Sequence, residues 1–396
     1  MFSSRLAWDV HPNRLSEALA RRRAAGAEIF DLTESNPTRA GLIHDAEEIL
    51  AAFDDPRILS YVPDPAGAPE ARNAVASYYA NRNVRVDPGH IVLTTSTSES
   101  YSWLFKLLAG PGDRILAPRP SYPLFEFLAS LESVTVTQYP LRYHGRWEVD
   151  FGALESLVDD RTRAVVLVSP NNPTGSYLKR DEYERLTELC RENDLALICD
   201  EVFADYAFEP DPLRLSTLAG AEEVLTFSLS GLSKVVGLPQ MKLGWMVVSG
   251  PERLRTTALE RIDLIADTYL SVGTPVMCAA PRLLDLAPRF QQRLMSRLRS
   301  NFRTLKEAIT RMPESEVLYV EGGWYATLRV PRIRSEEEWA LKLLEEGVLI
   351  QPGYFYDFES EAYLVLSLLT DPAVFSEGLG RLAGLITEEG PDRGLC

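Results

Sequence analysis

Cysteines are few in this sequence of 396 residues, and long apolar runs are missing. Cys199 ends a short apolar run, so we expect it to be buried. The cysteines lack the paired spacing of a zinc site or a disulfide framework. No apolar stretch approaches the roughly 20 residues that cross a bilayer, and the first ten residues carry charges in place of a signal sequence. We therefore expect no metal, no membrane partner and a reducing, cytoplasmic location. The cysteines are Cys190, Cys199, Cys278 and Cys396.

Positive charge is also scarce, because 41 Lys and Arg residues face 57 Asp and Glu residues, a net charge of −16 at pH 7. An acidic surface repels phosphate backbones, so nucleic acid is not an expected partner. No Gly-x-Gly-x-x-Gly follows a strand-like run, which argues against a nicotinamide dehydrogenase. The length and the 45% of hydrophobic residues predict a globular enzyme of two domains.

Short apolar runs alternate with amphipathic stretches from Ile91 onward, which predicts an α/β domain at 46–285 with a mainly parallel sheet covered by helices. Long helical patterns and a few strand-like runs follow it, which predicts a smaller α+β domain made of 1–45 and 286–396. The strand-like runs of the large domain are Ile91–Leu93, Arg114–Ala117, Val134–Thr137, Ala164–Val168, Leu195–Cys199, Val224–Phe227 and Trp245–Val248.

Polar residues follow several of these runs, at the sheet edge where ligands bind in open parallel sheets. The first run leads into Ser96, Thr97, Ser98 and Glu99, where Ser96 and Glu99 fit a capping box. The exposed N–H groups of a helix start bind phosphate well. Taken alone, however, the pattern more often marks a plain helix cap.

Four later positions carry further chemistry. Tyr122 is held between prolines and could stack on a flat ring. Asn172 stands in a turn dense in Pro, Asn and Gly. Asp200 follows a buried strand and would need a cation there. Lys234 lies among serines, where an amine can lose its proton and attack a carbonyl. Each residue alone also fits an ordinary structural role.

Together and in this order, three motifs resemble the class I and II aminotransferases, which are pyridoxal-phosphate (PLP) enzymes of fold type I. They are Ser-Pro-Asn-Asn-Pro-Thr-Gly at 169–175, Asp-Glu at 200–201 and Ser-Lys at 233–234. The similarity extends from about Thr33 to about Gly384. It implies that Lys234 holds PLP as an imine and moves a proton as general base and acid.

The resemblance also implies roles for the other positions. Asp200 would keep the ring nitrogen protonated, Asn172 would bind the ring oxygen and Tyr122 would stack on the ring. Tyr61 would reach the phosphate of a neighbouring subunit, which implies a homodimer, and Asn36 would lie beside the substrate. The phosphate would be held at the helix start and beside the lysine, by Ser96, Thr97, Ser98 and Ser233.

Three positions depart from the family pattern. Phe203 stands where a tyrosine is usual and cannot donate a hydrogen bond. Lys242 stands where an arginine usually grips the phosphate, and it keeps the charge without the two-pronged grip. Val365 stands where an arginine usually binds the substrate carboxylate. Arg39 is our first candidate to replace that arginine, and Arg329 the second.

Transamination between an amino acid or amine and a keto acid is therefore the leading hypothesis. Another PLP reaction on the same fold, such as elimination, decarboxylation or a synthase step, is the alternative, and so is a catalytically silent PLP-binding protein. A PLP-binding regulator fits poorly, because only about 30 residues precede the family match and the chain is acidic.

Overall fold

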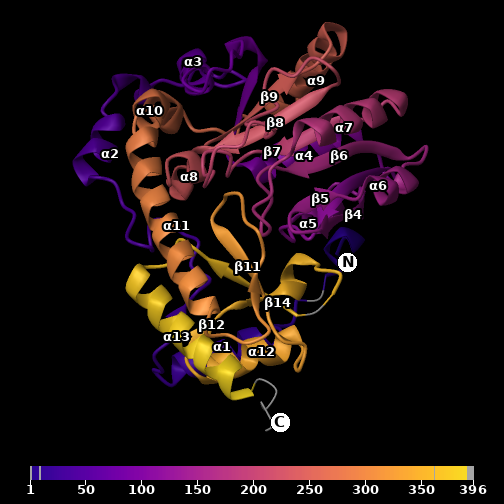
Figure 1. The fold of residues 1–396 in the computed structure, drawn as a ribbon. Helices are drawn as coiled ribbons and strands as arrows, with labels where there is room; N and C mark the ends of the chain where they lie inside the picture. The colour runs from indigo at the N-terminus through magenta and orange to yellow at the C-terminus, as the bar shows by residue number, and fades with distance from the viewer. Residues whose placement is uncertain (1, 9, 361, 390–396) are drawn as a thin grey trace.

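The computed structural model describes residues 2–8, 10–360 and 362–389, so Cys396 lies outside the described residues. Figure 1 shows an upper part built around a large sheet and a lower part with a smaller sheet, joined along one side by the long helix α11, Ala287–Ile309. The predicted fold class is confirmed: a mainly parallel sheet covered by helices, with a smaller α+β part.

Within the described residues the large sheet has eight strands in the order β2-β9-β8-β7-β6-β3-β4-β5. Strand β9 is antiparallel to both of its neighbours and β5 is antiparallel to β4, while the remaining strands share one direction. The strands are β2 Ile91–Thr94, β3 Arg114–Arg119, β4 Thr135–Tyr143, β5 Trp147–Val149, β6 Thr162–Val168, β7 Ala196–Asp200, β8 Thr226–Gly231 and β9 Gly244–Ser249.

Both faces of this sheet are buried, which explains its continuous apolar runs. Along β6, Val165 and Leu167 pack with helices α6 and α7, whereas Ala164 and Val166 pack with α4, α5 and α9. Side chains alternate between the faces of a strand, so each face needs its own apolar residues. The helices of this part are α2 Ala46–Ala52, α3 Pro69–Ala80, α4 Thr97–Leu108, α5 Phe125–Leu131, α6 Phe151–Leu157, α7 Arg180–Glu192, α8 Leu232–Val235, α9 Glu252–Tyr269 and α10 Thr274–Leu284.

The strand predicted at Val224–Phe227 was placed too early, because β8 begins at Thr226 and runs to Gly231. Ser228 and Ser230 lie inside the strand, fully buried, where their backbones pair with Val247 and Trp245 of β9. Apolar composition could not reveal this, since backbone pairing on both sides holds the strand whatever its side chains.

The lower part contains a four-stranded antiparallel sheet, β10-β11-β14-β13, and a two-stranded pair β1-β12 within the described residues. Strand β1 brings the N-terminal segment onto β12, so residues near 30 share a core with residues from 290 to 386. These elements are α1 Arg14–Ala24, β1 Phe30–Asp31, β10 Glu316–Val317, β11 Tyr325–Arg329, α12 Glu336–Glu345, β12 Val348–Leu349, β13 Gln351–Pro352, the short 3-10 helix η5 Gly353–Tyr356, β14 Tyr363–Ser367 and α13 Pro372–Glu389.

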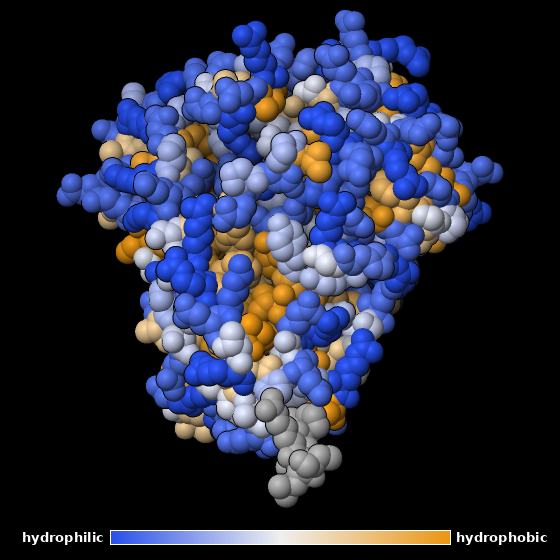
Figure 2. Space-filling model, in the orientation of Figure 1, coloured by the Kyte–Doolittle hydropathy of each residue, from blue (hydrophilic) through white to orange (hydrophobic). Residues whose placement is uncertain are grey.

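An apolar hollow is visible in Figure 2 between α11 and β11. It corresponds to a groove of about 710 Å³ whose lining includes Phe208, Phe302 and Val317. Neither Lys234 nor Asp200 lines this groove, so it is separate from the predicted site. Among the described residues, no helix is long and apolar enough to cross a membrane.

Candidate active site

Lys234 and Asp200 come from neighbouring strands of the large sheet. Asp200 ends β7, and Lys234 lies on α8 directly after β8. One carboxylate oxygen of Asp200 accepts the Val202 N–H at 3.1 Å and the other accepts the Tyr101 hydroxyl at 3.2 Å. Burial raises the pKa of Asp200 to about 6 and lowers the pKa of Lys234 to about 8. At neutral pH the lysine thus has a sizeable neutral fraction, and the buried acid favours a cation as its partner.

Aromatic rings surround the lysine amine. Nζ of Lys234 lies 4.9 Å from the ring centre of Trp324 and 5.6 Å from that of Phe203. Phe203 is buried and meets Trp324 edge-on, with ring centres 5.2 Å apart. The indole N–H of Trp324 is buried without a partner among the described residues. The amine is therefore held where little water reaches it, although Phe203 offers it no hydrogen bond.

The predicted phosphate turn is a capped helix start. Ser96 is the N-cap of α4, and its hydroxyl accepts the Glu99 N–H at 3.3 Å. The capping box is only half formed, because the Glu99 carboxylate accepts the N–H of Thr95, at 2.6 Å, and not that of Ser96. The hydroxyls of Thr97 and Ser98 have no hydrogen-bond partner in the part of the chain that is described. They are available to a ligand, whereas Ser96 is already used as a cap.

Two glycines let this turn approach the lysine segment. A Cβ on Gly244 would lie 3.0 Å from the backbone carbon of Ser96, and a Cβ on Gly231 would lie 3.0 Å from Cα of Gly244. The starts of α4, α8 and β9 therefore converge with no room for side chains between them. This close packing sets the start of α4 near Ser233 on α8, and the two together form a cradle that suits a phosphate group.

Lys242 stands at the edge of this cradle, two residues before Gly244. It is exposed, with a left-handed backbone (φ 52°), and the segment is tied to α8 by the hydrogen bond from Leu232 N–H to the Leu243 carbonyl at 2.9 Å. Lys242 forms no ion pair with another described residue. Its ammonium is therefore free to turn toward an anion.

The turn that carries Asn172 is fixed by its own backbone. The Asn171 N–H bonds the Ser176 carbonyl and the Gly175 N–H bonds the Asn171 carbonyl, both at 2.8 Å. The side-chain oxygen of Asn172 is buried without a partner among the described residues. An orphaned buried polar group in a rigid turn indicates a missing ligand atom.

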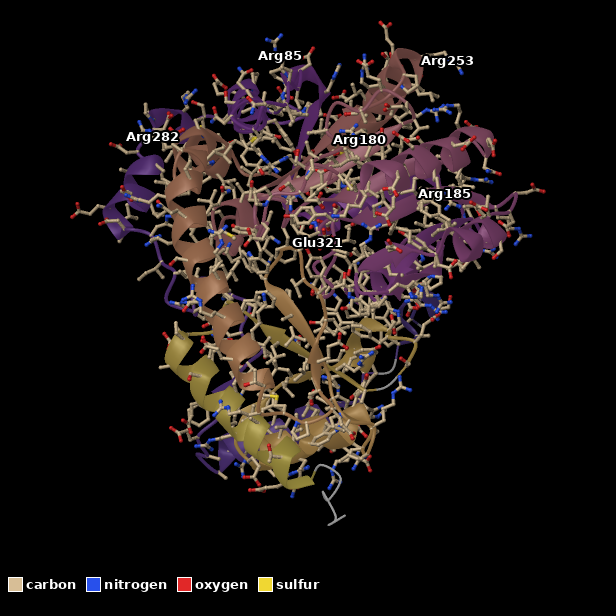
Figure 3. The ribbon with its side chains drawn as sticks, viewed as in Figure 1. Arg85, Arg180, Arg185, Arg253, Arg282 and Glu321 are labelled. Carbon is tan, nitrogen blue, oxygen red and sulfur yellow. The ribbon has the colours of Figure 1, made fainter. Side chains whose placement is uncertain are left out.

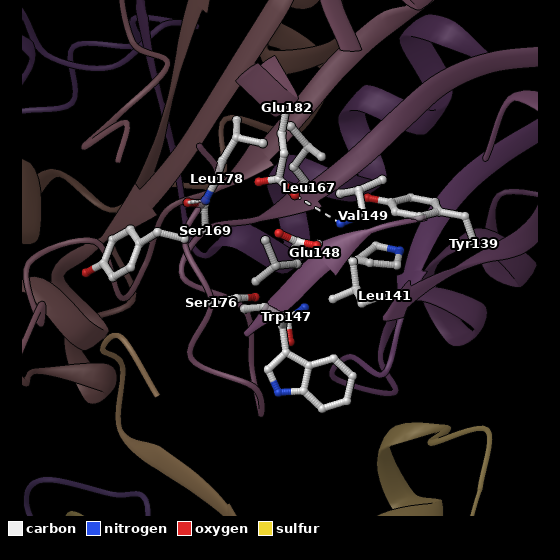
Figure 4. A pocket seen from close by; sticks show the side chains of 14 residues that line it. Tyr139, Leu141, Trp147, Glu148, Val149, Leu167, Ser169, Ser176, Leu178 and Glu182 are labelled. Atoms are coloured by element: carbon white, nitrogen blue, oxygen red, sulfur yellow. Dashed lines mark hydrogen bonds between the residues drawn. The ribbon is translucent and has the colours of Figure 1, made fainter. Parts of the chain in front are cut away.

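The space behind this turn is too small for a ligand. Figure 4 shows Ser169, Ser176 and Glu182 around a cavity of about 30 Å³, closed by the hydrogen bond from the Val149 N–H to Glu182 at 3.0 Å. A cavity of this size holds about one or two waters. The ligand of Asn172 must therefore lie on the opposite side of the turn.

Sequence reasoning missed the loop from Glu321 to Trp324, which crosses from the small sheet to the lysine. The Gly322 N–H bonds the Gly175 carbonyl at 3.1 Å, and the Gly323 N–H bonds the Tyr206 carbonyl at 2.9 Å. A Cβ on Gly322 would lie 2.3 Å from the Tyr206 carbonyl oxygen, so only glycine fits. The sole sequence signal was the Glu-Gly-Gly-Trp run before a strand.

Glu321 locks that loop in place. Its carboxylate forms a buried ion pair with Lys179 and accepts the Tyr177 N–H at 3.0 Å, while Lys179 also contacts Asp211 at 2.6 Å. Figure 3 shows Glu321 where the two parts of the molecule meet. The ion pair therefore holds Trp324 against Lys234.

The structure brings the remaining predicted residues together only in part. Tyr122 is 49% exposed and faces the small sheet, whereas Tyr61 is 76% exposed. The side-chain oxygen of Asn36 accepts the Thr38 N–H at 3.1 Å, so it holds its own N-terminal segment in place. Arg39 points into solvent, 71% exposed, and pairs with Glu34 at 3.2 Å.

Arg329 lies at the far end of β11, and its guanidinium pairs with Glu316 at the surface. The structure gives it no contact with the lysine end of the strand. Val365 is fully buried in β14, opposite Thr327. The second candidate for the missing arginine is therefore wrong, and sequence proximity misled because the strand carries the side chain away.

Taken together, these residues fit a phosphate-bearing pyridine cofactor with an aldehyde. Lys234 offers an amine of lowered pKa, Asp200 a half-buried acid of raised pKa for a ring cation, and Asn172 an unpaired amide oxygen. The close packing at Gly231 and Gly244 brings the start of α4, with Thr97 and Ser98, near the lysine segment, where a phosphate could bind.

The comparisons with known proteins agree with this geometry. Residues 27–375 match the family model described as aminotransferase class I and II. The glutamate-pyruvate aminotransferase AlaA of Haemophilus influenzae is 24% identical over 390 residues, covering 96% of both chains. The alanine aminotransferase of Mycobacterium bovis is 27% identical over 380 residues, covering 91% of this chain and 87% of its own.

The same fold occurs in the solved structure of alanine aminotransferase from Pyrococcus furiosus, with a TM-score of 0.87 at 23% identity over 98% of this chain and 100% of that one. Because the family model spans most of the sequence and the site residues fit the cofactor, the chain belongs to the class I and II aminotransferases, a family of PLP-dependent enzymes.

Proposed function

We propose that this protein moves an amino group between an amino acid or amine and a keto acid, with Lys234 as the residue that carries the cofactor. The observation that supports it most is the half-buried amine of Lys234, with its pKa lowered to about 8, near the half-buried carboxylate of Asp200. When bound, PLP supplies an electron-withdrawing ring that accepts the electron pair released at the substrate carbon.

The residues around the lysine divide the work. Lys234 takes a proton from the substrate carbon and returns it to the cofactor side. An amine with a pKa of about 8 can accept a proton in its neutral form and donate it in its charged form near neutral pH. Asp200 holds the ring nitrogen in its protonated form, because a buried carboxylate is stabilised by a cation. Trp324 and Phe203 exclude water from the amine.

The phosphate is held, in this proposal, by the start of α4 with Thr97 and Ser98, by Ser233 and by the ammonium of Lys242. Asn172 binds the ring oxygen and Tyr122 stacks on the ring. Support for the phosphate site comes from the unpaired hydroxyls of Thr97 and Ser98 at the helix start. Asn172 would bind the ring oxygen through its side-chain N–H groups, because its amide oxygen can only accept. A helix N-terminus favours a dianion electrostatically.

We also propose a homodimer with shared sites and a cytoplasmic location. An apolar strip near the start of the large sheet supports the dimer, because large exposed apolar patches mark protein interfaces. Its members include Ile43 61%, Leu50 71%, Leu59 86%, Tyr61 76% and Val62 72% exposed. Light scattering should give twice the chain mass, and a monomer would contradict the proposal.

The division into a large domain at 46–285 and a small domain at 1–45 plus 286–396 is likewise proposed. One apolar core gathers residues from Leu15 to Leu42 with those from Phe290 to Ile386, and this supports the boundary. Phe203, Tyr206 and Phe208 of the large domain also join that core, so the two domains pack tightly at the site.

Absorbance of the purified protein with PLP tests the function. A yellow band should form, bleach when an amino donor is added and return with a keto acid. Release of ammonia without a keto-acid acceptor would mean elimination, and release of carbon dioxide would mean decarboxylation. A band that forms and never bleaches would mean a silent PLP-binding protein.

A further inference from the structure

The wall of the site that belongs to the small sheet carries no charge. Tyr325 and Thr327 lie two residues apart on β11 and share one face. Across the sheet, Thr327 pairs with Val365, which in turn pairs with Gln351. The ring of Tyr325 is 6.1 Å from Phe203, whose own ring is 5.6 Å from Nζ of Lys234. Phe203 therefore links the Tyr325 end of this row to the reacting amine.

The polar atoms of the wall are neutral hydrogen-bonding groups. The Tyr356 hydroxyl, from η5, donates to the side-chain oxygen of Gln351. That leaves the Gln351 amide N–H groups without a partner among the described residues. The Thr327 hydroxyl is buried and has no partner within the described part of the chain. Desolvation raises the pKa of Tyr325 to about 12 and raises that of Tyr356 further, so both phenols stay uncharged.

Cations do not approach this wall from its neighbours. Gln351, Tyr356 and Tyr122 also line a cavity of about 360 Å³, where the charged lining residues are Glu126 and Asp357, both acidic. Arg39, in the segment that follows β1, is exposed to solvent and pairs with Glu34. Among the described residues, Lys234 itself is the cation that contacts the rings of Phe203 and Trp324.

A carboxylate pressed against such a wall would lose its water and gain no counterion, which costs several kcal/mol as an order of magnitude. A neutral acceptor would instead gain hydrogen bonds from the unpaired Gln351 amide. We propose that this wall, formed by Tyr325, Gln351 and Tyr356, receives an uncharged hydrogen-bonding group of the amino substrate, such as an amide, ester or alcohol, where other substrates would place a carboxylate. The inference rests on the proposed function.

Binding of ligands without an amine tests the wall apart from catalysis. Calorimetry on the PLP-loaded protein should compare 3-phenylpropionamide with 3-phenylpropionate, which differ only in charge at one end. The amide should bind at least about ten-fold more tightly, because the site can form hydrogen bonds with the amide but leaves the charge of the carboxylate unpaired. Equal binding, or tighter binding of the carboxylate, would overturn the proposal.

Variants locate the preference on the wall. Tyr356→Phe keeps the ring and frees the Gln351 oxygen, so it should reduce the preference for the amide several-fold. Tyr354→Phe removes the hydroxyl of the neighbouring tyrosine on the same short helix, which is 41% exposed, and should leave the preference unchanged. Gln351→Lys adds a cation and should reverse it. A preference that survives both wall variants would place recognition elsewhere.

Donor conversion separates this inference from the function. With L-phenylalaninamide and L-phenylalanine as matched donors, the amide should bleach the yellow band at least ten-fold faster. Faster bleaching by phenylalanine would overturn the inference and leave transamination intact. If no amino donor of any kind bleaches the band, the proposed function fails, while the binding measurement still decides the nature of the wall.

Discussion

The cofactor end and the substrate end of this site are built in different ways. At the cofactor end, Asp200 ends one strand, and Asn172 and Lys234 follow its two neighbours in the same sheet, so the order of the chain already places them together. At the substrate end, Trp324, Gln351 and Tyr356 come from a second sheet about 100 or more residues later in the sequence. The first end depends on topology, whereas the second depends on how two parts of the chain dock.

The largest effect should come from the cofactor end. Lys234→Ala removes the amine that holds the cofactor and moves the proton, so the turnover should fall by about 10²–10⁴-fold. Absorbance should show loss of the yellow band, and steady-state assays the loss of rate. Lys342→Ala, at a surface pair with Glu345, is the control and should retain both. A yellow band in the alanine variant would contradict the assignment.

The docking of the two ends can be weakened at Glu321. Glu321→Gln leaves Lys179 with Asp211 alone, so unfolding should become easier by about 1–3 kcal/mol and Trp324 should move relative to Lys234. Urea unfolding and tryptophan fluorescence measure the two effects. Glu316→Gln, at an exposed pair with Arg329, should cost less than about 1 kcal/mol. Equal losses in both variants would show that the buried pair has no special role.

Lys234, at the cofactor end, should also lower the free energy of unfolding of the cofactor-free protein at neutral pH. The pKa of Lys234 is about 8 in the folded chain and near 10.5 when unfolded, so the unfolded state binds more protons between these values. Stability from this group is therefore low below pH 8 and rises toward pH 10.5. Lys234→Met should raise the free energy of unfolding at pH 7 by about 2–3 kcal/mol, as chemical denaturation would measure. A gain that persists at pH 10.5 would exclude this cause.

The smallest effect is expected at Phe203. Phe203→Tyr adds a hydroxyl that can donate to the cofactor's ring oxygen and stabilise its charge. The yellow form should then titrate about one pH unit lower, since a hydrogen bond to a charged group contributes about 1.5 kcal/mol. Spectroscopic titration measures it, and an unchanged or higher titration pH would refute the prediction.

The two ends also differ in how far the sequence predicted them. The residues after β6, β7 and β8 were identified because a sheet brings strand ends to one edge. Tyr101, which donates to Asp200, was missed because it lies inside a helix with no motif around it. Glu321 and Trp324 were missed because only the docked structure shows them beside Lys179 and Lys234. Arg329 failed for a related reason, since the direction of a strand decides which of its ends reaches the site.

The two glycines after Glu321 have a consequence for how the enzyme can change over time. Their backbone N–H groups, and no side chain, join the small sheet to the Gly175 and Tyr206 carbonyls. These backbone contacts do not depend on which side chains occupy other positions of that sheet. Substitutions at Gln351 or Tyr356 can therefore accumulate without shifting Trp324 from the lysine, so one catalytic core can acquire new substrates through changes in the wall.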